Sequence, residues 1–176
     1  MRLTLGPLQY FWPREQVLAF YREAADWPVD VIYLGETVCS KRRELRTNDW
    51  VELARELAGS GREIVLSTLA LLEAESELAS LTRLVENGQF LVEANDMSAV
   101  QLLRERGLPF VGGPSLNVYN PTALRLLRED GLRRLVLGVE QGREVIDEFR
   151  AGGEPMPELE ITGWGRLPLS YSARCF

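Results

Sequence analysis

The chain has 176 residues, of which 45% are hydrophobic and 26% are charged, and its formal net charge is −6. This composition is that of a folded domain large enough to bury a core, and it excludes a disordered or collagen-like chain. The acidic balance argues against non-specific binding to nucleic acid, whose affinity comes largely from Lys and Arg on phosphates.

Short apolar runs alternate with amphipathic stretches from one end of the chain to the other. We expect strands near Leu3–Leu5, Val29–Leu34, Glu63–Leu66, Phe90–Glu93, Phe110–Val111, Leu132–Leu137 and Leu159–Thr162. We expect helices near Arg14–Ala25, Asn48–Leu57, Glu73–Glu86, Met97–Arg106, Pro121–Glu129 and Arg143–Arg150. The strands are near-continuous apolar runs, which is typical of parallel strands buried on both faces.

Residues at the expected helix ends support these boundaries. Asn120 precedes Pro121, and this pair suits an N-cap followed by the first helical turn. Gly88, Gly107 and Gly131 each follow an expected helix, where glycine commonly ends one.

The alternation of strands and helices predicts an α/β fold with a parallel sheet. No G-x-G-x-x-G motif follows the first strand, so a dinucleotide-binding domain is disfavoured. The unit spacing suits a (β/α) TIM-type barrel, whose usual length is ~250 residues. We therefore expect residues 1–176 to form a single TIM-barrel-like domain, an incomplete barrel of about seven parallel strands, and to be the N-terminal part of a longer protein.

Ligands of parallel α/β proteins bind at the carboxyl ends of the strands. Polar residues and glycines follow the expected strands at Gly35 and Glu36, Ser67 and Thr68, Glu93 and Asn95, Gly112 and Gly113, Gly138 and Glu140, and Gly163 and Arg166. They could line a pocket, or they could reflect only the usual polarity of loops. The candidate substrate-binding residues are Glu36, Glu93, Asn95, Asn117, Arg166 and Arg174.

Simpler roles compete for several polar residues. Glu73, Glu75 and Glu77 suit a helix N-terminus, where negative charge offsets the helix dipole. Asn120 is explained by capping, whereas Asn117 has no evident structural duty.

The chain contains two cysteines, Cys39 and Cys175, and no histidine. Cations follow Cys39 at positions 41–43 and Arg174 precedes Cys175, and such neighbours favour the thiolate. The cysteines could be small core residues, a disulfide (disfavoured in a reducing compartment), redox or nucleophilic thiols, or metal ligands. Two thiols are fewer than the four ligands of a typical cluster or structural zinc site, and these observations leave the choice open.

The absence of histidine excludes Ser-His-Asp and Cys-His catalysis within this chain. No apolar run approaches the ~18 residues of a membrane span. Gly6, Pro7 and Pro13 interrupt the N-terminal region, which is therefore not a secretory signal. We expect a cytoplasmic protein.

Four segments carry a resemblance that runs along essentially the whole chain. They are GETVCSKRREL (35–45), LSTLALLEAESEL (66–78), LVEAND (91–96) and GRLPLSYSARCF (165–176). The chain resembles the collagenase-like peptidase family, and within it the members that act in ubiquinone biosynthesis. The resemblance implies a TIM-barrel-like fold and a [4Fe–4S] cluster held by four cysteines.

On that resemblance, Cys39 and Cys175 match the first two cluster ligands. The other two ligands lie downstream of SARCF in the family, beyond position 176, so the natural protein is expected to be longer. This chain alone could supply half of a ligand set, and we expect that it does not hold the cluster by itself.

The resemblance also implies a function and partners. It predicts an iron–sulfur subunit for oxygen-independent hydroxylation of a ubiquinone precursor, in a heterodimer with UbiU. A sterol-carrier-type lipid-binding accessory protein and prephenate, as hydroxyl donor, are further implied partners.

Other functions remain open. The chain could be a non-catalytic partner subunit of the same complex. Peptidase-type members carry a His-Gly pair and an extra cysteine ahead of the second cluster cysteine, whereas this chain reads Trp-Gly-Arg-Leu-Pro at 164–168, which argues against proteolysis. Sibling proteins that hydroxylate transfer RNA gain no support from the acidic balance.

Overall fold

The computed structural model describes residues 1–42, 44–153, 155–168 and 170–172. In these residues the strands are β1 Thr4–Leu5, β2 Val31–Leu34, β3 Glu63–Ser67, β4 Leu91–Ala94, β5 Phe110–Gly112, β6 Leu132–Val136 and β7 Glu158–Glu160. The α-helices are α1 Arg14–Ala24, α2 Thr47–Leu57, α3 Glu75–Val85, α4 Met97–Glu105, α5 Pro121–Glu129 and α6 Arg143–Ala151. Two short 3-10 helices, Ala58–Ser60 and Pro114–Leu116, follow α2 and β5.

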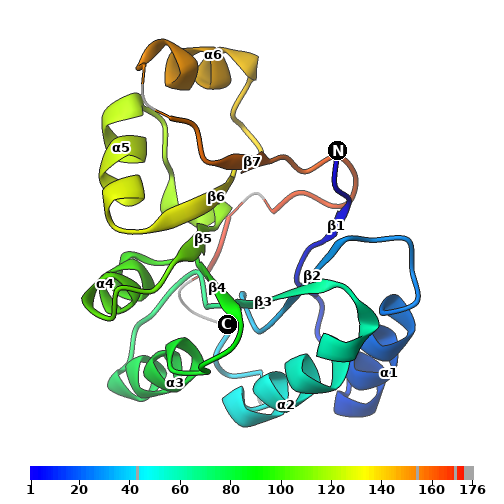
Figure 1. The fold of residues 1–176 in the computed structure, drawn as a ribbon. Coiled ribbons are helices and arrows are strands. Elements are labelled where there is room, and N and C mark those ends of the chain that lie inside the picture. The colour runs from blue at the N-terminus through cyan, green and yellow to red at the C-terminus, as the bar shows by residue number, and fades with distance from the viewer. Residues whose placement is uncertain (43, 154, 169, 173–176) are drawn as a thin grey trace. The chain divides into compact units, whose positions relative to one another are not determined.

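The strands follow one another in the sheet in chain order, from β1 to β7, and α1 to α6 lie between successive strands in the sequence (Figure 1). Neighbours pair in parallel where β1 meets β2, β2 meets β3, β5 meets β6 and β6 meets β7. This arrangement confirms the expected α/β class: it is the (β/α) repeat of a TIM-type barrel, with seven strands in the described residues where a complete barrel has eight.

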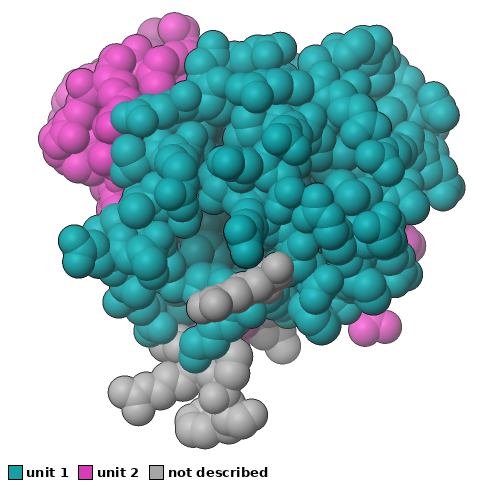
Figure 2. Space-filling view, turned by 90° about the horizontal axis from the view of Figure 1, so that it is seen from below, with its two compact units in different colours: residues 1–92 teal, residues 93–176 magenta. Residues whose placement is uncertain are grey.

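The chain divides into two compact units, Met1–Val92 and Glu93–Phe176, which are coloured separately in Figure 2. In the first unit, β2 is buried at every position. The inner stripe of α2 consists of Trp50, Leu53, Ala54 and Leu57, spaced as one face of a helix, and all four are buried. In the second unit, Phe110, Leu135 and Phe149 are each at most 1% exposed.

Side-chain caps begin α4 and α5. The Asn120 carboxamide oxygen accepts from the Ala123 amide at 2.9 Å, with Pro121 next in the first turn, as expected from the sequence. Asp96 accepts from the Ser98 amide at 2.7 Å and so caps α4. Each cap satisfies an amide that the helix itself leaves without a partner.

The expected elements all occur, with ends that shift by up to two residues or so. The three glycines expected after helices, Gly88, Gly107 and Gly131, have positive φ and follow α3, α4 and α5. Among the described residues, no helix has the length and apolar character that crossing a bilayer requires.

Candidate functional site

The loop after β2 is organised by the carboxylate of Glu36. Its Oε1 accepts from the amides of Val38 at 2.9 Å and Cys39 at 3.0 Å. The Arg42 guanidinium lies 3.8 Å from the same oxygen and donates to the Gln9 carbonyl at 2.7 Å. Burial raises the pKa of Glu36, while the two amides and Arg42 act in the opposite direction.

Cys39 is half-buried in this loop, and within the described residues it is a free cysteine. Its amide is bonded to Glu36, and its carbonyl accepts from the Arg42 amide at 3.1 Å. The backbone on both sides of the thiol is therefore fixed by local hydrogen bonds. The Arg42 guanidinium contacts Glu36 and the Gln9 carbonyl. These contacts hold the loop together and do not involve the Cys39 thiol.

The same loop is tied to the start of α3 through Glu77. The Glu77 carboxylate accepts from the amides of Glu73 at 2.6 Å and Ala74 at 3.1 Å, which confirms that this carboxylate serves a helix N-terminus. It also bonds Ser40 and lies near Lys41, and these contacts lower the pKa of Glu77, with the Ser40 hydrogen bond as the largest cause.

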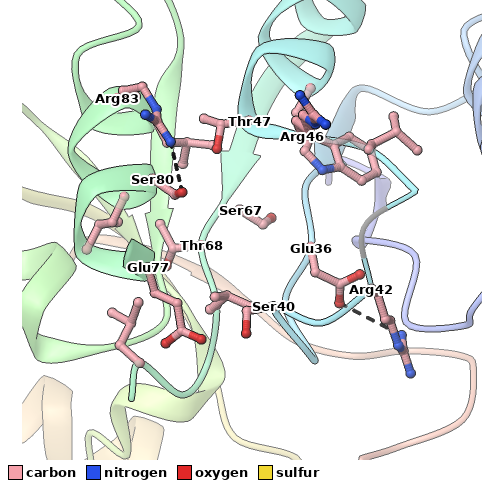
Figure 3. A pocket seen from close by; sticks show the side chains of 16 residues that line it. Glu36, Ser40, Arg42, Arg46, Thr47, Ser67, Thr68, Glu77, Ser80 and Arg83 are labelled. Atoms are coloured by element: carbon pink, nitrogen blue, oxygen red, sulfur yellow. Dashed lines mark hydrogen bonds and ion pairs between the residues drawn. The ribbon is translucent and has the colours of Figure 1, made fainter. Parts of the chain in front are cut away.

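Between α2, α3 and the carboxyl ends of β2 and β3 lies a pocket of about 450 Å³. Figure 3 shows Arg83, Thr47 and Arg46 toward the top of the view, Glu77, Ser40 and Glu36 toward the bottom, and Ser67 between them. The remaining lining is formed by Arg42, Thr68, Ser80, Trp50 and five leucines at positions 45, 69, 72, 81 and 84. The volume falls within the range of about 300–1,000 Å³ typical of small-molecule sites.

Gly35 lets the two strand ends meet beneath this pocket. Its φ is +152°, and a Cβ at this position would lie 2.3 Å from the backbone oxygen of Ser67. Only glycine can occupy a position that combines such a φ with such a close backbone approach. Steric crowding therefore explains why a glycine occupies this strand end, where the sequence analysis noted one.

The second unit has its own polar cluster at the ends of β4 and β5. Glu93 and Asn95 are 3% and 5% exposed, and the Asn95 amide nitrogen donates to Glu93 Oε2 at 3.1 Å. The Ser115 hydroxyl donates to the Asn95 backbone oxygen at 2.5 Å. A Cβ on Gly113 would lie 1.9 Å from Asn95 Oδ1, so glycine is required for the asparagine side chain to sit there.

Tyr171, near the C-terminus, is influenced by the charge of Glu93 in this cluster. Tyr171 is half-buried, and its pKa is raised by burial first and by the charge of Glu93 second.

The other candidate substrate-binding residues belong to neither the pocket nor the polar cluster, or lie outside the described residues. Asn117 is exposed, and its φ of 54° ends the 3-10 helix Pro114–Leu116 in the left-handed region. Asparagine tolerates this conformation better than most residues, so Asn117 has the structural duty that sequence reasoning did not find. Arg166 is exposed. Arg174 and Cys175 lie outside the described residues.

Of the candidate residues that the structure describes, Glu36 alone lines the pocket, whereas Glu93 and Asn95 belong to the cluster in the second unit. Sequence reasoning singled out Ser67 and Thr68 as strand-end residues but missed the helical contributions of Arg46, Trp50, Ser80 and Arg83. The spacing of Trp50 and Leu53 marks a buried helix face, and no signal in the sequence shows that a cavity lies against part of it.

Residues 14–176 match the family described as Peptidase family U32. The chain belongs to this family. Because the match covers nearly the whole chain, it confirms the collagenase-like peptidase resemblance at the level of the family.

Solved structures show the same fold at low sequence identity. A mandelate racemase/muconate lactonizing enzyme from Roseiflexus sp. is 16% identical with a TM-score of 0.59, over 93% of this chain and 48% of that one. A putative enzyme of the same description from Sorangium cellulosum is 14% identical (TM-score 0.58, 92% and 46%). An enolase superfamily member from Enterococcus faecalis is 15% identical (TM-score 0.57, 91% and 42%). The chain spans less than half the length of these proteins, and the likeness concerns the fold alone.

The residues of this chain do not by themselves make up the ligand set of a [4Fe–4S] cluster. Such a cluster is held by four thiolates, whereas the sequence contains two cysteines, of which the structure describes Cys39. Among the described residues, no group of three or more His, Cys, Asp or Glu side chains could hold a metal ion.

Proposed function

We propose that this chain acts as UbiV does, as an iron–sulfur subunit needed for oxygen-independent hydroxylation in ubiquinone biosynthesis, together with UbiU. Membership of Peptidase family U32 supports this proposal, and its motive is the resemblance of the segments around Cys39 and Cys175 to the members that act in ubiquinone biosynthesis. Cys39 and Cys175 would supply two of the four cluster ligands, and the other two would come from sequence beyond position 176.

The observation that carries the proposal is the setting of Cys39. The thiol belongs to a loop at the carboxyl end of β2, where parallel α/β proteins bind their ligands. Glu36 holds the Cys39 amide, so the loop is organised before any ligand binds. A buried structural cysteine would need no such position, whereas a ligand must be both ordered and reachable.

Iron content tests the assignment of Cys39. The gene product, including any sequence past position 176, would be purified anaerobically with iron and sulfide, beside Cys39→Ala and Ser76→Ala variants. We expect the Cys39 variant to lose its bound iron and visible absorbance, because a cluster that lacks a thiolate ligand is poorly held. Ser76→Ala changes an exposed residue of α3 without removing a ligand and serves as the control. Full iron content in Cys39→Ala would exclude this ligand assignment.

The family description makes proteolysis a second candidate. The chain has no histidine, so a peptidase mechanism would have to use carboxylates, thiols or a metal site of another kind. Incubation of the iron-free protein with casein or gelatin tests whether it has peptidase activity. Cleavage by the purified protein would favour the peptidase over the hydroxylation subunit.

A non-catalytic subunit is the third candidate. In that case, the Cys39→Ala variant would still support quinone hydroxylation in cells, provided that it still binds UbiU. Loss of hydroxylation with retained UbiU binding is the result that our proposal expects.

A further inference from the structure

Two polar side chains that line the pocket between α2 and α3 have no hydrogen-bond partner among the residues that the structure describes. Ser67 is 2% exposed and Trp50 is 7% exposed, and neither Ser67 Oγ nor Trp50 Nε1 is bonded. Buried polar groups are almost always paired, and an indole N–H can act only as a donor. The pocket therefore contains a position suited to a hydrogen-bond acceptor.

The charges around the pocket favour an acceptor that is an anion. Among the described residues, three guanidinium groups and two carboxylates line it, which leaves a single positive charge. Arg42 faces Glu36, and Glu77 is occupied by Ser40 and two amides.

The guanidinium groups of Arg46 and Arg83 are the two that can bind an anionic ligand. Arg83 uses one nitrogen to donate to Ser80 Oγ at 3.1 Å. Arg46 lies near Asp49, but the Asp49 carboxylate is held at 2.9 Å by Arg14. Arg46 also stands at the N-terminus of α2, where the helix dipole adds positive potential.

The rest of the lining is apolar. Leu45, Leu81 and Leu84 are buried, Leu69 and Leu72 are half-buried, and the Trp50 ring adds an aromatic surface. A highly charged phosphate ester would leave this surface unused, and one surplus positive charge matches a monoanion. The lining is therefore suited to a molecule with an apolar body and one carboxylate.

We propose that the pocket between α2 and α3 binds an amphipathic monocarboxylate. Its carboxylate lies toward Arg46 and Arg83 and accepts from Trp50 Nε1 or Ser67 Oγ, and its apolar body packs against the leucines. The site requires neither iron nor Cys175. A failed binding test would therefore refute this proposal without refuting the proposed function, and the reverse also holds.

A matched pair of probes tests the proposal. 1-Naphthylacetate and its neutral isostere 1-naphthylacetamide would be titrated calorimetrically into the iron-free protein. We expect the carboxylate to bind at least about tenfold more tightly than the amide, because only the carboxylate forms charge-assisted hydrogen bonds. Equal affinities would overturn the proposal in favour of an apolar pocket. No saturable binding would overturn it in favour of a pocket that holds only water.

Two arginine variants test whether the carboxylate probe binds in this pocket. Arg46→Gln and Arg83→Gln should each weaken the carboxylate by about three- to tenfold and leave the amide unchanged. Both arginines are exposed, so neither change threatens folding. Arg125→Gln, which changes a half-buried arginine on α5 in the second unit, is the control and should have no effect. Weakening by Arg125→Gln to the same degree would show that binding is non-specific attraction to positive charge.

The indole signal of Trp50 gives a readout at the site itself. In an NMR titration, the Trp50 Nε1–H resonance, assigned by its loss in Trp50→Phe, should shift downfield with 1-naphthylacetate as it gains an acceptor. A shift confined to the other indole signals would place the probe elsewhere and overturn the proposal.

Discussion

The Glu36 carboxylate is held by two backbone amides in a half-buried position, and burial is the largest influence on its pKa, which is raised. The folded state therefore retains this proton to a higher pH than the unfolded state. Between the ordinary pKa of 4.5 and the raised folded value, the free energy of unfolding falls as pH rises.

Glu36→Gln should remove this pH dependence while keeping an oxygen for the two amides. We expect the variant to gain stability relative to the wild-type protein as pH rises through that window, as measured by chemical denaturation at a series of pH values. Glu148→Gln, an exposed change on α6, controls for the loss of one carboxylate. A stability difference that is constant with pH, or that shrinks as pH rises, would contradict the assigned direction.

At the scale of elements, an ion pair joins β6 to β7. Arg134 and Glu158 are register partners in the parallel pair, and their side chains meet at 2.9 Å. The Arg134 side chain is 8% exposed, whereas that of Glu158 is 61% exposed. Breaking such a contact from the exposed side leaves a buried guanidinium with a weaker partner.

Glu158→Gln should therefore destabilise the protein by about 1–3 kcal/mol, because a hydrogen bond to a buried charge is lost or weakened. Urea denaturation measures the change. Asp147→Asn is the control, since the contacts of Asp147 with Arg143 and Arg150 are exposed and longer, at 3.7 and 3.6 Å, and exposed pairs contribute little. Equal losses in the two variants would show that burial of Arg134 does not matter.

The elements themselves were largely predictable from the sequence. Hydrophobic period, the Asn120–Pro121 cap and the glycines after helices depend on local chemistry, and the structure confirms them. The end of the chain was less well predicted: β7 is Glu158–Glu160 and not Leu159–Thr162, because its register follows the pairing of Glu158 with Arg134. Such a contact between strands leaves no local pattern.

The candidate sites were only partly predictable for the same reason. Glu36, Ser67 and Thr68 stand out because they follow strands, and all three line the pocket. Arg46 and Arg83 look like ordinary exposed helix residues in sequence, and only the packing of α3 beside α2 brings them to one cavity.

At the scale of the whole molecule, the proposed function requires two cysteines that are far apart in the sequence to act together. Cys39 belongs to the first compact unit, and Cys175 lies outside the described residues. If both are ligands of one cluster, removing either leaves the same incomplete site. Residues that act as a unit have strongly non-additive effects.

Cys175→Ala in the full gene product should therefore lose as much iron as Cys39→Ala, and the double variant should lose no more than either. Iron and acid-labile sulfide, measured after anaerobic reconstitution, give the comparison, with Ser172→Ala as a control from the same segment. Two partial losses that add in the double variant would mean that each thiol binds iron separately. Normal loading of Cys175→Ala beside an iron-free Cys39→Ala would restrict the site to the loop after β2 and break the proposed pairing of the two thiols.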